Sequence, residues 1–397
     1  MVAEFYPRPG DPAWGIWAHR QALAVRSEGV DIRVVALDRP LPSLNDVRAL
    51  PHLGPLGNWA RTLVDPRRRA RPTTLDGIPV RYARFLSPPR PLSYRSWGRW
   101  AARPVARQLD EINAEQRVNL VHAHYAVPAG DAVLRWMGRR ARLPFVVSVH
   151  GGDLSYTAAR SARGRETVRR VLAAADAVIA NSSVTRRGIE EITGPLPELH
   201  VIHPGADLMD PAAERHEQPT LVTVANLEAH KNQAAVIRAL AALKDGTPGL
   251  RYVLIGKGPD RASLESLAEF LGVAERVSFL GPLPHDRALA ELARCHVHVM
   301  PSIHDAFGVA HIEAMAAGLP SIGGAGTGAE DIAAAGEGLL VVPPGDPAAL
   351  VRALHGLLVD PAERARLAAA ARQTVADHFT WSRNGAETAA LYRRLAR

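Results

Sequence analysis

Strand-like apolar runs alternate with helix-forming segments along this 397-residue chain, and the alternation occurs twice. In the first half, a helical segment at residues 16–28 leads through Gly29 into an apolar run at 31–37. In the second half, an apolar run at 220–224 precedes a helical segment at 233–243. Strands that alternate with helices predict a parallel sheet, and two such halves predict two cores. The expected fold class is therefore α/β, with two Rossmann-like, doubly wound domains that face an interdomain cleft.

The composition of the connecting segments predicts the domain boundaries. Residues 1–208 are expected to form the N-terminal domain and residues 220–378 the C-terminal domain. Residues 209–219 between them are polar and flanked by proline, which is typical of a linker. Residues 379–397 form a last helical segment. Between residues 40 and about 90 the pattern breaks into Pro, Gly and Arg, which predicts a long insertion that is partly mobile.

Charge and cysteine content restrict the class of protein and its partners. Residues 1–200 carry 30 Arg and no Lys against 18 acidic residues, whereas acidic residues exceed basic ones in the remainder. A GC-rich genome would explain some of the arginine, but not this asymmetry, which suggests a contact with a membrane surface or a lipid-phosphate acceptor. No nucleic-acid partner is expected. The single cysteine, Cys295, excludes a disulfide framework.

The same features indicate where the protein acts. The N-terminus does not have the charged segment and apolar run of a secretory signal, and no apolar stretch approaches the roughly 20 residues that span a bilayer. The expected location is cytoplasmic, with peripheral contact at the inner membrane face as a further expectation.

Aromatic and basic residues are interleaved between residues 94 and 112. Trp97 and Trp100 stand there among four arginines. This pattern is compatible with a helix at a membrane interface, and also with a surface helix that packs its tryptophan face on the sheet, which is the commoner case. Pro104 argues against one unbroken helix, because proline has no N–H to donate and its ring collides with the preceding turn.

Residues 301–320 read PSIHDAFGVAHIEAMAAGLP and directly follow an alternating, strand-like run at 296–300. Asp305 lies on the connecting loop, and Glu313 lies inside the helix that follows. In a doubly wound sheet, a loop that leaves the carboxyl end of a strand is where ligands bind, and the helix N-terminus favours a phosphate. Taken singly, Asp305 as a helix cap and Glu313 as a solvated side chain would be ordinary.

Together, the two carboxylates, the Phe307-Gly308 pair between them and the ending EAMAAGLP resemble the donor-site signature of glycosyltransferase family four. The resemblance implies a retaining transferase with the GT-B fold, and a C-terminal helix, residues 379–397, that crosses back to the N-terminal domain. It implies a nucleotide-diphosphate sugar as co-substrate and no further cofactor. No metal is expected, since no Asp-x-Asp motif appears. The family usually has Glu where this chain has Asp305, so that side chain is one methylene shorter.

Lys231 is the expected diphosphate ligand. It precedes a helix N-terminus, where its charge adds to the helix dipole, and it falls where the family pattern Gly-Arg-Leu…Lys has its lysine. Ala225 and Asn226 replace the Gly and Arg of that pattern, which removes a bidentate charged contact. Either Lys231 and backbone N–H groups hold the diphosphate, or the binding mode differs, or activity is reduced. The donor-binding residues that the resemblance implies are Gly15, Asn226, Lys231, Gly256, Leu280, Phe307, Gly308, Val309, Glu313 and Glu330.

His150 is expected to contact the donor sugar. It ends the apolar run at 145–149 and precedes two glycines, a position where open α/β sheets carry site residues. The resemblance agrees, because in the family a His followed by Gly contacts the donor sugar and the reacting centre. A turn histidine is the structural alternative, as an ordinary turn glycine is for Gly15. The residues expected to be catalytic are His150, Lys231 and Asp305.

His122 and His124 share one face of a strand-like run, because residues two apart in a strand point the same way. Two histidines could bind zinc, but no cysteine or third histidine lies nearby in the sequence, and no metal site is expected. One of the two histidines is instead expected to reach the interdomain cleft at the end of the strand. His124 and Asp153 are assigned to the acceptor side of the cleft.

The expected function is transfer of a sugar from a UDP- or GDP-sugar to a hydroxyl acceptor, in the synthesis of a glycan, glycolipid or secondary metabolite. The acceptor is expected to be a glycan, a lipid-linked sugar or a small molecule. Resemblance to family members that build cell-surface polysaccharides supports this expectation. Two alternatives remain, a nucleotide-sugar epimerase of the same fold and a non-catalytic family member, the latter because of Asn226 and Asp305.

Overall fold

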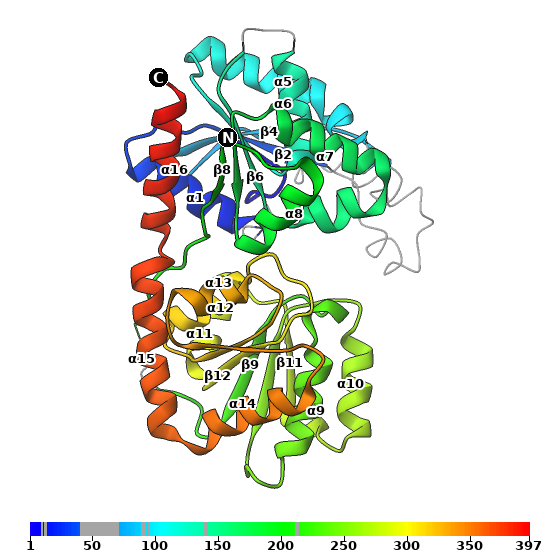
Figure 1. Ribbon diagram of the computed structural model, residues 1–397, viewed down its shortest axis with the longest axis vertical. Coiled ribbons are helices and arrows are strands. Elements are labelled where there is room, and N and C mark those ends of the chain that lie inside the picture. The colour runs from blue at the N-terminus through cyan, green and yellow to red at the C-terminus, as the bar shows by residue number, and fades with distance from the viewer. Residues whose placement is uncertain are drawn as a thin grey trace. The chain divides into compact units, whose positions relative to one another are not determined.

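The structure is a computed structural model that describes residues 1–8, 11, 14–39, 71–88, 93, 96–138, 142–210 and 214–397. It divides into two compact units (Figure 1). Unit 1 comprises residues 1–181, 185–202 and 384–397, and unit 2 comprises residues 182–184 and 203–383. The expected domain boundaries at residues 208, 219 and 378 stay predictions. The expected mobility of residues 40–70 concerns a segment outside the described residues.

Unit 1 is built on one sheet with the strand order β3-β4-β2-β1-β5-β6-β7-β8. All neighbouring strands are parallel except the pair formed by β3 and β4. The strands are β1 Val2–Ala3, β2 Val34–Asp38, β3 Thr73–Leu75, β4 Ile78–Arg84, β5 Val121–His124, β6 Phe145–Val149, β7 Ala177–Ala180 and β8 Leu199–Val201.

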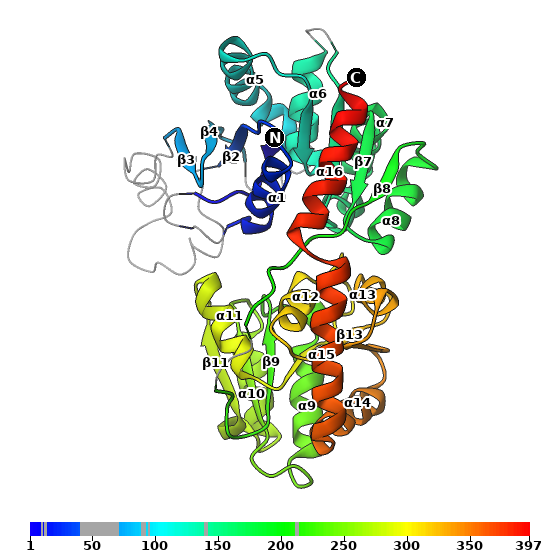
Figure 2. The same cartoon turned by 90° about the vertical axis from the view of Figure 1, so that its left-hand side faces the viewer.

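Successive residues of a strand point to opposite faces of the sheet, and both sets are buried in the central strands. Helices therefore cover both faces. The helices are α1 Ile16–Ser27, α5 Trp97–Glu115, α6 Asp131–Met137, α7 Ala162–Ala174, α8 Ser183–Thr193 and α16 Trp381–Leu395. Val35 and Val147 pack against α5, α6 and α7, whereas Ala36 and Val146 pack against α1 and α16. Figure 2 shows α16 beside α1, although the two helices are far apart in the sequence. A Cβ on Gly385 would lie 2.4 Å from the Ala24 carbonyl oxygen, so α16 can approach α1 this closely only with glycine there.

Two expectations for unit 1 are wrong. Helix α5 runs unbroken through Pro104. The carbonyl that loses its hydrogen-bond donor belongs to Trp100, which is 48% exposed and can be solvated, while Trp97, Ala101 and Val105 on the buried face hold the helix to the core. Residues 71–88, expected to be part of an irregular insertion, contain the β3–β4 hairpin, whose turn has Asp76 and Gly77 at positive φ.

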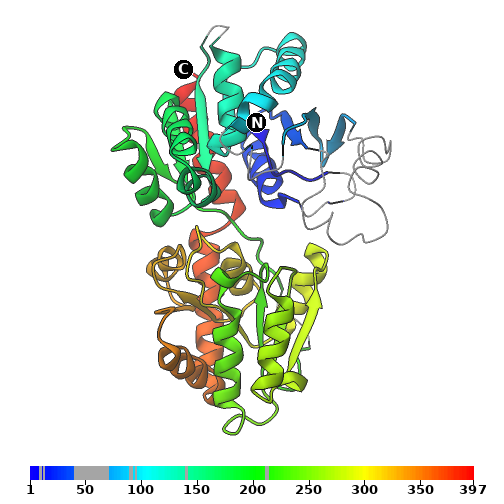
Figure 3. The ribbon, with the colours of Figure 1, turned by 90° about the vertical axis from the view of Figure 1, so that its right-hand side faces the viewer.

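Unit 2 contains a six-stranded parallel sheet with the order β11-β10-β9-β12-β13-β14. The strands are β9 Thr220–Val224, β10 Arg251–Ile255, β11 Val277–Gly281, β12 Val297–Met300, β13 Ser321–Gly324 and β14 Leu339–Val342. The helices are α9 Gln233–Leu243, α10 Arg261–Phe270, α11 His285–Arg294, α12 Val309–Ala316, α13 Ala329–Ala335, α14 Pro347–Val359 and α15 Pro361–His378. Helices α9, α10 and α14 cover one face of the sheet, and α11 and α12 cover the other (Figure 3).

Both sheets are doubly wound, which confirms the predicted α/β fold class. The strand order reverses between β9 and β12 in unit 2, and between β1 and β5 in unit 1. At such a reversal the loops that leave the two strands diverge to opposite faces and open a crevice for a ligand. Lys231 follows β9 and Asp305 follows β12, so the topology places both at the same edge of the unit 2 sheet.

Among the described residues, none of the helices combines the length and the apolar composition that crossing a membrane requires.

Candidate functional site

The most informative contact at the carboxyl edge of the unit 2 sheet joins Lys231 and Asp305. Lys231 Nζ lies 2.6 Å from Asp305 Oδ2, and the two side chains are 17% and 15% exposed. The loops that carry them are joined by a hydrogen bond from the Ile303 N–H to the His230 carbonyl (2.8 Å). Half-burial strengthens the attraction between these charges relative to an exposed pair. The sequence predicted each residue separately, and the structure brings them together.

The backbone around Lys231 is held in a fixed conformation. Residues Ala229–Lys231 form a 3-10 turn, and Asn232 has a positive φ of 59° before α9 begins at Gln233. The Asn232 side-chain amide donates to the carbonyl of Pro301 (3.1 Å), on the loop after β12. Asparagine tolerates this left-handed conformation better than most residues, which explains its presence between the turn and the helix.

Gly308 starts α12 in the left-handed conformation, with φ 88°. A Cβ at this position would lie 2.6 Å from His311 Cδ2. His311 is fully buried, and its Nδ1 lies 2.8 Å from the Ser321 hydroxyl, which also lies 2.8 Å from His298 Nδ1. Burial, with the nearby charge of Lys231 as a smaller cause, lowers the pKa of His311 to about 3, so the ring is neutral near pH 7.

The remaining donor-side residues of unit 2 lie around this pair. Asn226 is exposed on the loop after β9, and Leu280 is 42% exposed at the end of β11. A Cβ on Gly256 would lie 1.9 Å from the Ala225 carbonyl oxygen, so glycine lets the loops after β9 and β10 touch. Val309 is half-buried in the first turn of α12.

Three further donor-side residues already have partners within the unit. Phe307 is a core side chain, 2% exposed and in tilted contact with Phe379 at a ring-centroid distance of 5.8 Å, so only its backbone is available to a ligand. Glu330 Oε1 accepts a hydrogen bond from the Gly326 N–H (2.8 Å) and thereby orders the glycine-rich loop after β13. Glu313 Oε1 lies 3.7 Å from His285 Nε2.

In unit 1 the loops that follow β1, β5 and β6 bring aromatic rings around His150. The His124 and His150 rings are nearly parallel, and His124 Nδ1 lies 3.0 Å from His150 Nε2. Trp17 and Tyr125 also contact His150, at centroid distances of 4.2 and 5.1 Å. Burial lowers the pKa of His150 to about 3 and that of His124 well below its ordinary value. Both rings are therefore neutral near pH 7 and act as hydrogen-bonding groups.

Asp153 is fully buried just after His150. Its Oδ1 accepts a hydrogen bond from the Val127 N–H (3.2 Å), and its Oδ2 has no partner among the described residues. Burial raises the pKa of Asp153 well above its ordinary value, so the carboxyl group tends to hold a proton. His122, on the same strand as His124, bonds Ser148 Oγ at 2.7 Å and the Tyr392 hydroxyl, which gives it a structural role.

Gly15 precedes α1 with φ 68°, and a Cβ there would lie 2.2 Å from the carbonyl carbon of Phe5. The close approach of two backbone segments already requires glycine here. Its role as a donor-binding residue stays a prediction.

Trp17, Tyr125 and His311 were not predicted from the sequence to belong to the site. Trp17 lies in the first turn of α1, directly after the Gly15 loop, and its place next to a predicted ligand loop was the only signal available. Tyr125 and His311 contact the predicted residues through tertiary packing.

Two family profiles, several curated proteins and many solved structures are similar to this chain. Residues 15–210 match the profile described as "Glycosyltransferase Family 4", and residues 207–374 match the one described as "Glycosyl transferases group 1". A GDP-mannose-dependent alpha-(1-6)-phosphatidylinositol monomannoside mannosyltransferase of Mycolicibacterium smegmatis is 31% identical over 307 residues, covering 72% of this chain and 79% of that protein. A glycogen synthase of Mycobacterium tuberculosis is 31% identical over 292 residues, covering 70% and 69%. Among solved structures, a sucrose-phosphate synthase from Thermosynechococcus elongatus has a TM-score of 0.75 at 21% identity, over 99% of this chain and 98% of that one.

Proposed function

Since this chain belongs to glycosyltransferase family four, we propose how its own residues perform the transfer that defines the family. The chain is a retaining, nucleotide-sugar-dependent glycosyltransferase with the GT-B fold. In such a transfer the bond between the anomeric carbon and the diphosphate breaks, and a bond to the acceptor oxygen forms with the same anomeric configuration. The observation that carries our assignment is the ion pair of Lys231 and Asp305, at the strand reversal of unit 2.

Lys231 is the proposed diphosphate ligand. The departing diphosphate gains negative charge, and a half-buried ammonium group stabilises that charge more than an exposed one would. The N-terminus of α12, which begins after Gly308, adds backbone N–H groups and the positive end of the helix dipole. Asp305 holds Lys231 in place and accepts hydrogen bonds from the sugar, and Glu313 accepts hydrogen bonds from the ribose hydroxyls.

In unit 1, His150 is proposed to contact the transferred sugar. With a pKa of about 3 it is an uncharged imidazole near pH 7, so it contributes hydrogen bonds rather than a counter-charge for the diphosphate. Asp153, proposed for the acceptor side, would act there as a protonated carboxyl group with a free Oδ2.

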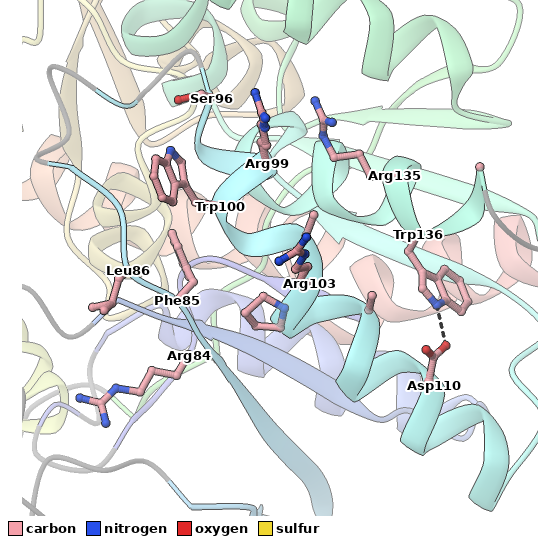
Figure 4. Close-up of a pocket in the computed structure, with 14 residues that line it drawn as sticks. Arg84, Phe85, Leu86, Ser96, Arg99, Trp100, Arg103, Asp110, Arg135 and Trp136 are labelled. Carbon is pink, nitrogen blue, oxygen red and sulfur yellow. Dashed lines mark hydrogen bonds between the residues drawn. The ribbon is translucent and has the colours of Figure 1, made fainter.

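A groove beside α5 favours an anionic acceptor or membrane partner. It has a volume of about 1360 Å3 and lies where β4 ends and α5 begins. Figure 4 shows four arginines around it together with exposed apolar groups. The lining includes Arg84, Arg99, Arg103, Arg135, Leu86 and Trp100. The Mycolicibacterium smegmatis relative is named for a phosphatidylinositol-based acceptor, and we propose that this chain also meets an anionic lipid surface, through this groove.

The transfer itself is tested by following diphosphate release from UDP- and GDP-sugars, with and without lipid, glycan and small-molecule hydroxyl acceptors. Release that depends on an acceptor, with a product of retained configuration, is the expected result. An epimerised sugar nucleotide without release would support the epimerase instead, and failure to bind any donor would support a non-catalytic protein.

The groove is tested by vesicle flotation. We expect binding to vesicles with anionic phospholipid. Binding should be about 30-fold weaker when Arg99 and Arg103 are both changed to Gln, since each basic residue near an anionic surface contributes about 1 kcal/mol. Arg107→Gln is the matched control on the same helix, because Arg107 is paired with Glu111 at 2.9 Å. Equal binding to anionic and zwitterionic vesicles, or equal loss in the control, would contradict the proposal.

A further inference from the structure

Unit 2 has a cavity of about 480 Å3 away from the carboxyl edge of its sheet. Its polar lining residues are Arg215, His296, Arg364 and Arg372. Arg215 precedes β9 and His296 immediately precedes β12, so the cavity lies at the amino ends of the parallel strands. Lys231 and Asp305 follow the carboxyl ends of the same strands. The cavity and the candidate donor site are therefore on opposite edges of one sheet.

The three arginines share one property: among the described residues, their side chains donate hydrogen bonds to backbone carbonyls only. The acceptors are Cys295 and Gly318 for Arg215, Leu357 and Leu358 for Arg364, and Met209 and Ala316 for Arg372. Carbonyl groups orient a guanidinium without cancelling its charge. Over the described ranges, none of the three forms an ion pair with a carboxylate.

The remaining arginine of α15 is paired with carboxylates. Arg366, on the same helix, is paired with Glu363 at 2.7 Å and with Glu337 at 2.6 Å. Glu291, which lies near Cys295, is paired with His216 at 2.9 Å. Carboxylates are thus available in this part of the chain, yet they are not used to neutralise the cavity.

His296 adds a fourth donor to the cavity. Its Nδ1 accepts a hydrogen bond from the Thr220 N–H (3.2 Å), so in the neutral ring the proton is on Nε2. Burial, then the charges of Arg364 and Arg215, lower the pKa of His296 to about 4. Near pH 7 the ring is uncharged, and its Nε2–H can be donated to an anion.

The cavity is electrostatically unfavourable when empty. Burial, and next the charge of Arg364, lower the pKa of Arg215 from its usual value, which shows that the two guanidinium groups repel each other. Capping of carbonyl groups would explain each arginine singly. These hydrogen bonds do not explain why three arginines and a histidine N–H surround one cavity whose lining contains no carboxylate.

We propose that this cavity binds a phosphate group, either free phosphate or the phosphate of a small phosphorylated metabolite. Planar guanidinium groups match the oxygens of a phosphate, and three of them supply enough charge for a dianion. The small residues that complete the wall, Gly318 and Ala368 among them, leave room for the ligand. Such a ligand would tie the segment around Arg215 to helix α15.

The test measures calorimetric binding of inorganic phosphate and of a hexose phosphate at low ionic strength. It uses the full chain carrying Lys231→Ala, so that phosphate held at the candidate donor site does not contribute. In that background, Ala365→Glu adds a carboxylate to the cavity wall without removing a hydrogen bond. Arg364→Gln removes one of the charges. Ala362→Glu and Arg366→Gln are the matched controls, because neither residue lines the cavity.

We expect Ala365→Glu and Arg364→Gln each to weaken phosphate binding by about tenfold or more, and both controls to bind as the parent does. Tighter binding of the hexose phosphate than of inorganic phosphate would identify a metabolite as the ligand, and equal binding would identify free phosphate. No binding of either by the parent, or equal binding by Ala365→Glu and its control, would overturn the proposal. Because the donor-site lysine is absent throughout, failure here leaves the proposed transfer reaction untouched.

Discussion

At the scale of single residues, the charges in the candidate donor site nearly cancel, so the site is not strongly basic. Lys231 is paired with Asp305 at 2.6 Å, and Asn226 stands where the related pattern has an arginine. A diphosphate must therefore draw Lys231 partly away from Asp305, or rely on the backbone N–H groups at the start of α12. The shorter side chain of Asp305 fits the first possibility, since an aspartate leaves more room beside the lysine than a glutamate would.

Asp153 gives the clearest prediction for a single side chain. Burial raises its pKa, so above about pH 4 the folded chain holds a proton that the unfolded chain releases, and this costs stability as the pH rises. Asp153→Asn keeps the Oδ1 acceptor for the Val127 N–H and removes the titration. We expect the stability of the variant relative to the parent to rise from pH 4 toward pH 7, by at most about 1.4 kcal/mol per pH unit.

Denaturant unfolding followed by tryptophan fluorescence is suited to this measurement, because five of the six tryptophans among the described residues lie in unit 1. A stability difference that does not change between pH 4 and pH 7 would show that Asp153 is ionised in the folded chain.

At the scale of elements, the start of α12 shows how much of the site depends on packing. The Phe-Gly motif predicted that Gly308 belongs to the donor site, but it did not show why the backbone needs glycine there. The left-handed φ of 88° and the contact with His311 both exclude a Cβ, and His311 is held in turn by Ser321. Loop and helix are therefore fixed together beside Asp305.

Gly308→Ala should destabilise unit 2 by more than a left-handed alanine alone does, which is about 1–2 kcal/mol. Gly272→Ala is the matched control, since Gly272 has a similar φ of 65° and its nearest neighbour to a Cβ is 4.0 Å away. Thermal unfolding of the two variants, followed by circular dichroism, gives the comparison. Equal losses of stability would mean that the His311 side chain moves away from the added methyl group with no loss of stability, and that it does not fix the loop.

At the scale of the whole molecule, the fold was predictable and the pairings within the site were not. Alternating apolar and helical segments predicted two doubly wound units, and both sheets have that order. Pro104 was misinterpreted, because only the packing of α5 shows that the lost hydrogen bond falls on its exposed face. The β3–β4 hairpin was missed, because its short edge strand has no clear apolar alternation.

The residues of the candidate site were predictable, but the contacts between them were not. Lys231, Asp305 and His150 were predicted from their places after strands, where α/β sheets bind ligands, together with the resemblance to the family pattern. The 2.6 Å ion pair of Lys231 and Asp305 and the stacking of His150 on His124 depend on which strands become neighbours. Strand order is a long-range property that local pattern does not contain.

The measurement that tests the donor-site assignment most directly is calorimetric binding of UDP and GDP to the parent, to Lys231→Ala and to Lys244→Ala. Lys244 ends α9, at the opposite edge of the sheet, and serves as the charge-matched control. If Lys231 holds the diphosphate, Lys231→Ala weakens binding of the preferred nucleotide by about 10- to 100-fold, the value of a charge-assisted hydrogen bond, and Lys244→Ala leaves it unchanged. Unchanged affinity in Lys231→Ala would contradict the assignment of this lysine, and with it the proposed donor site.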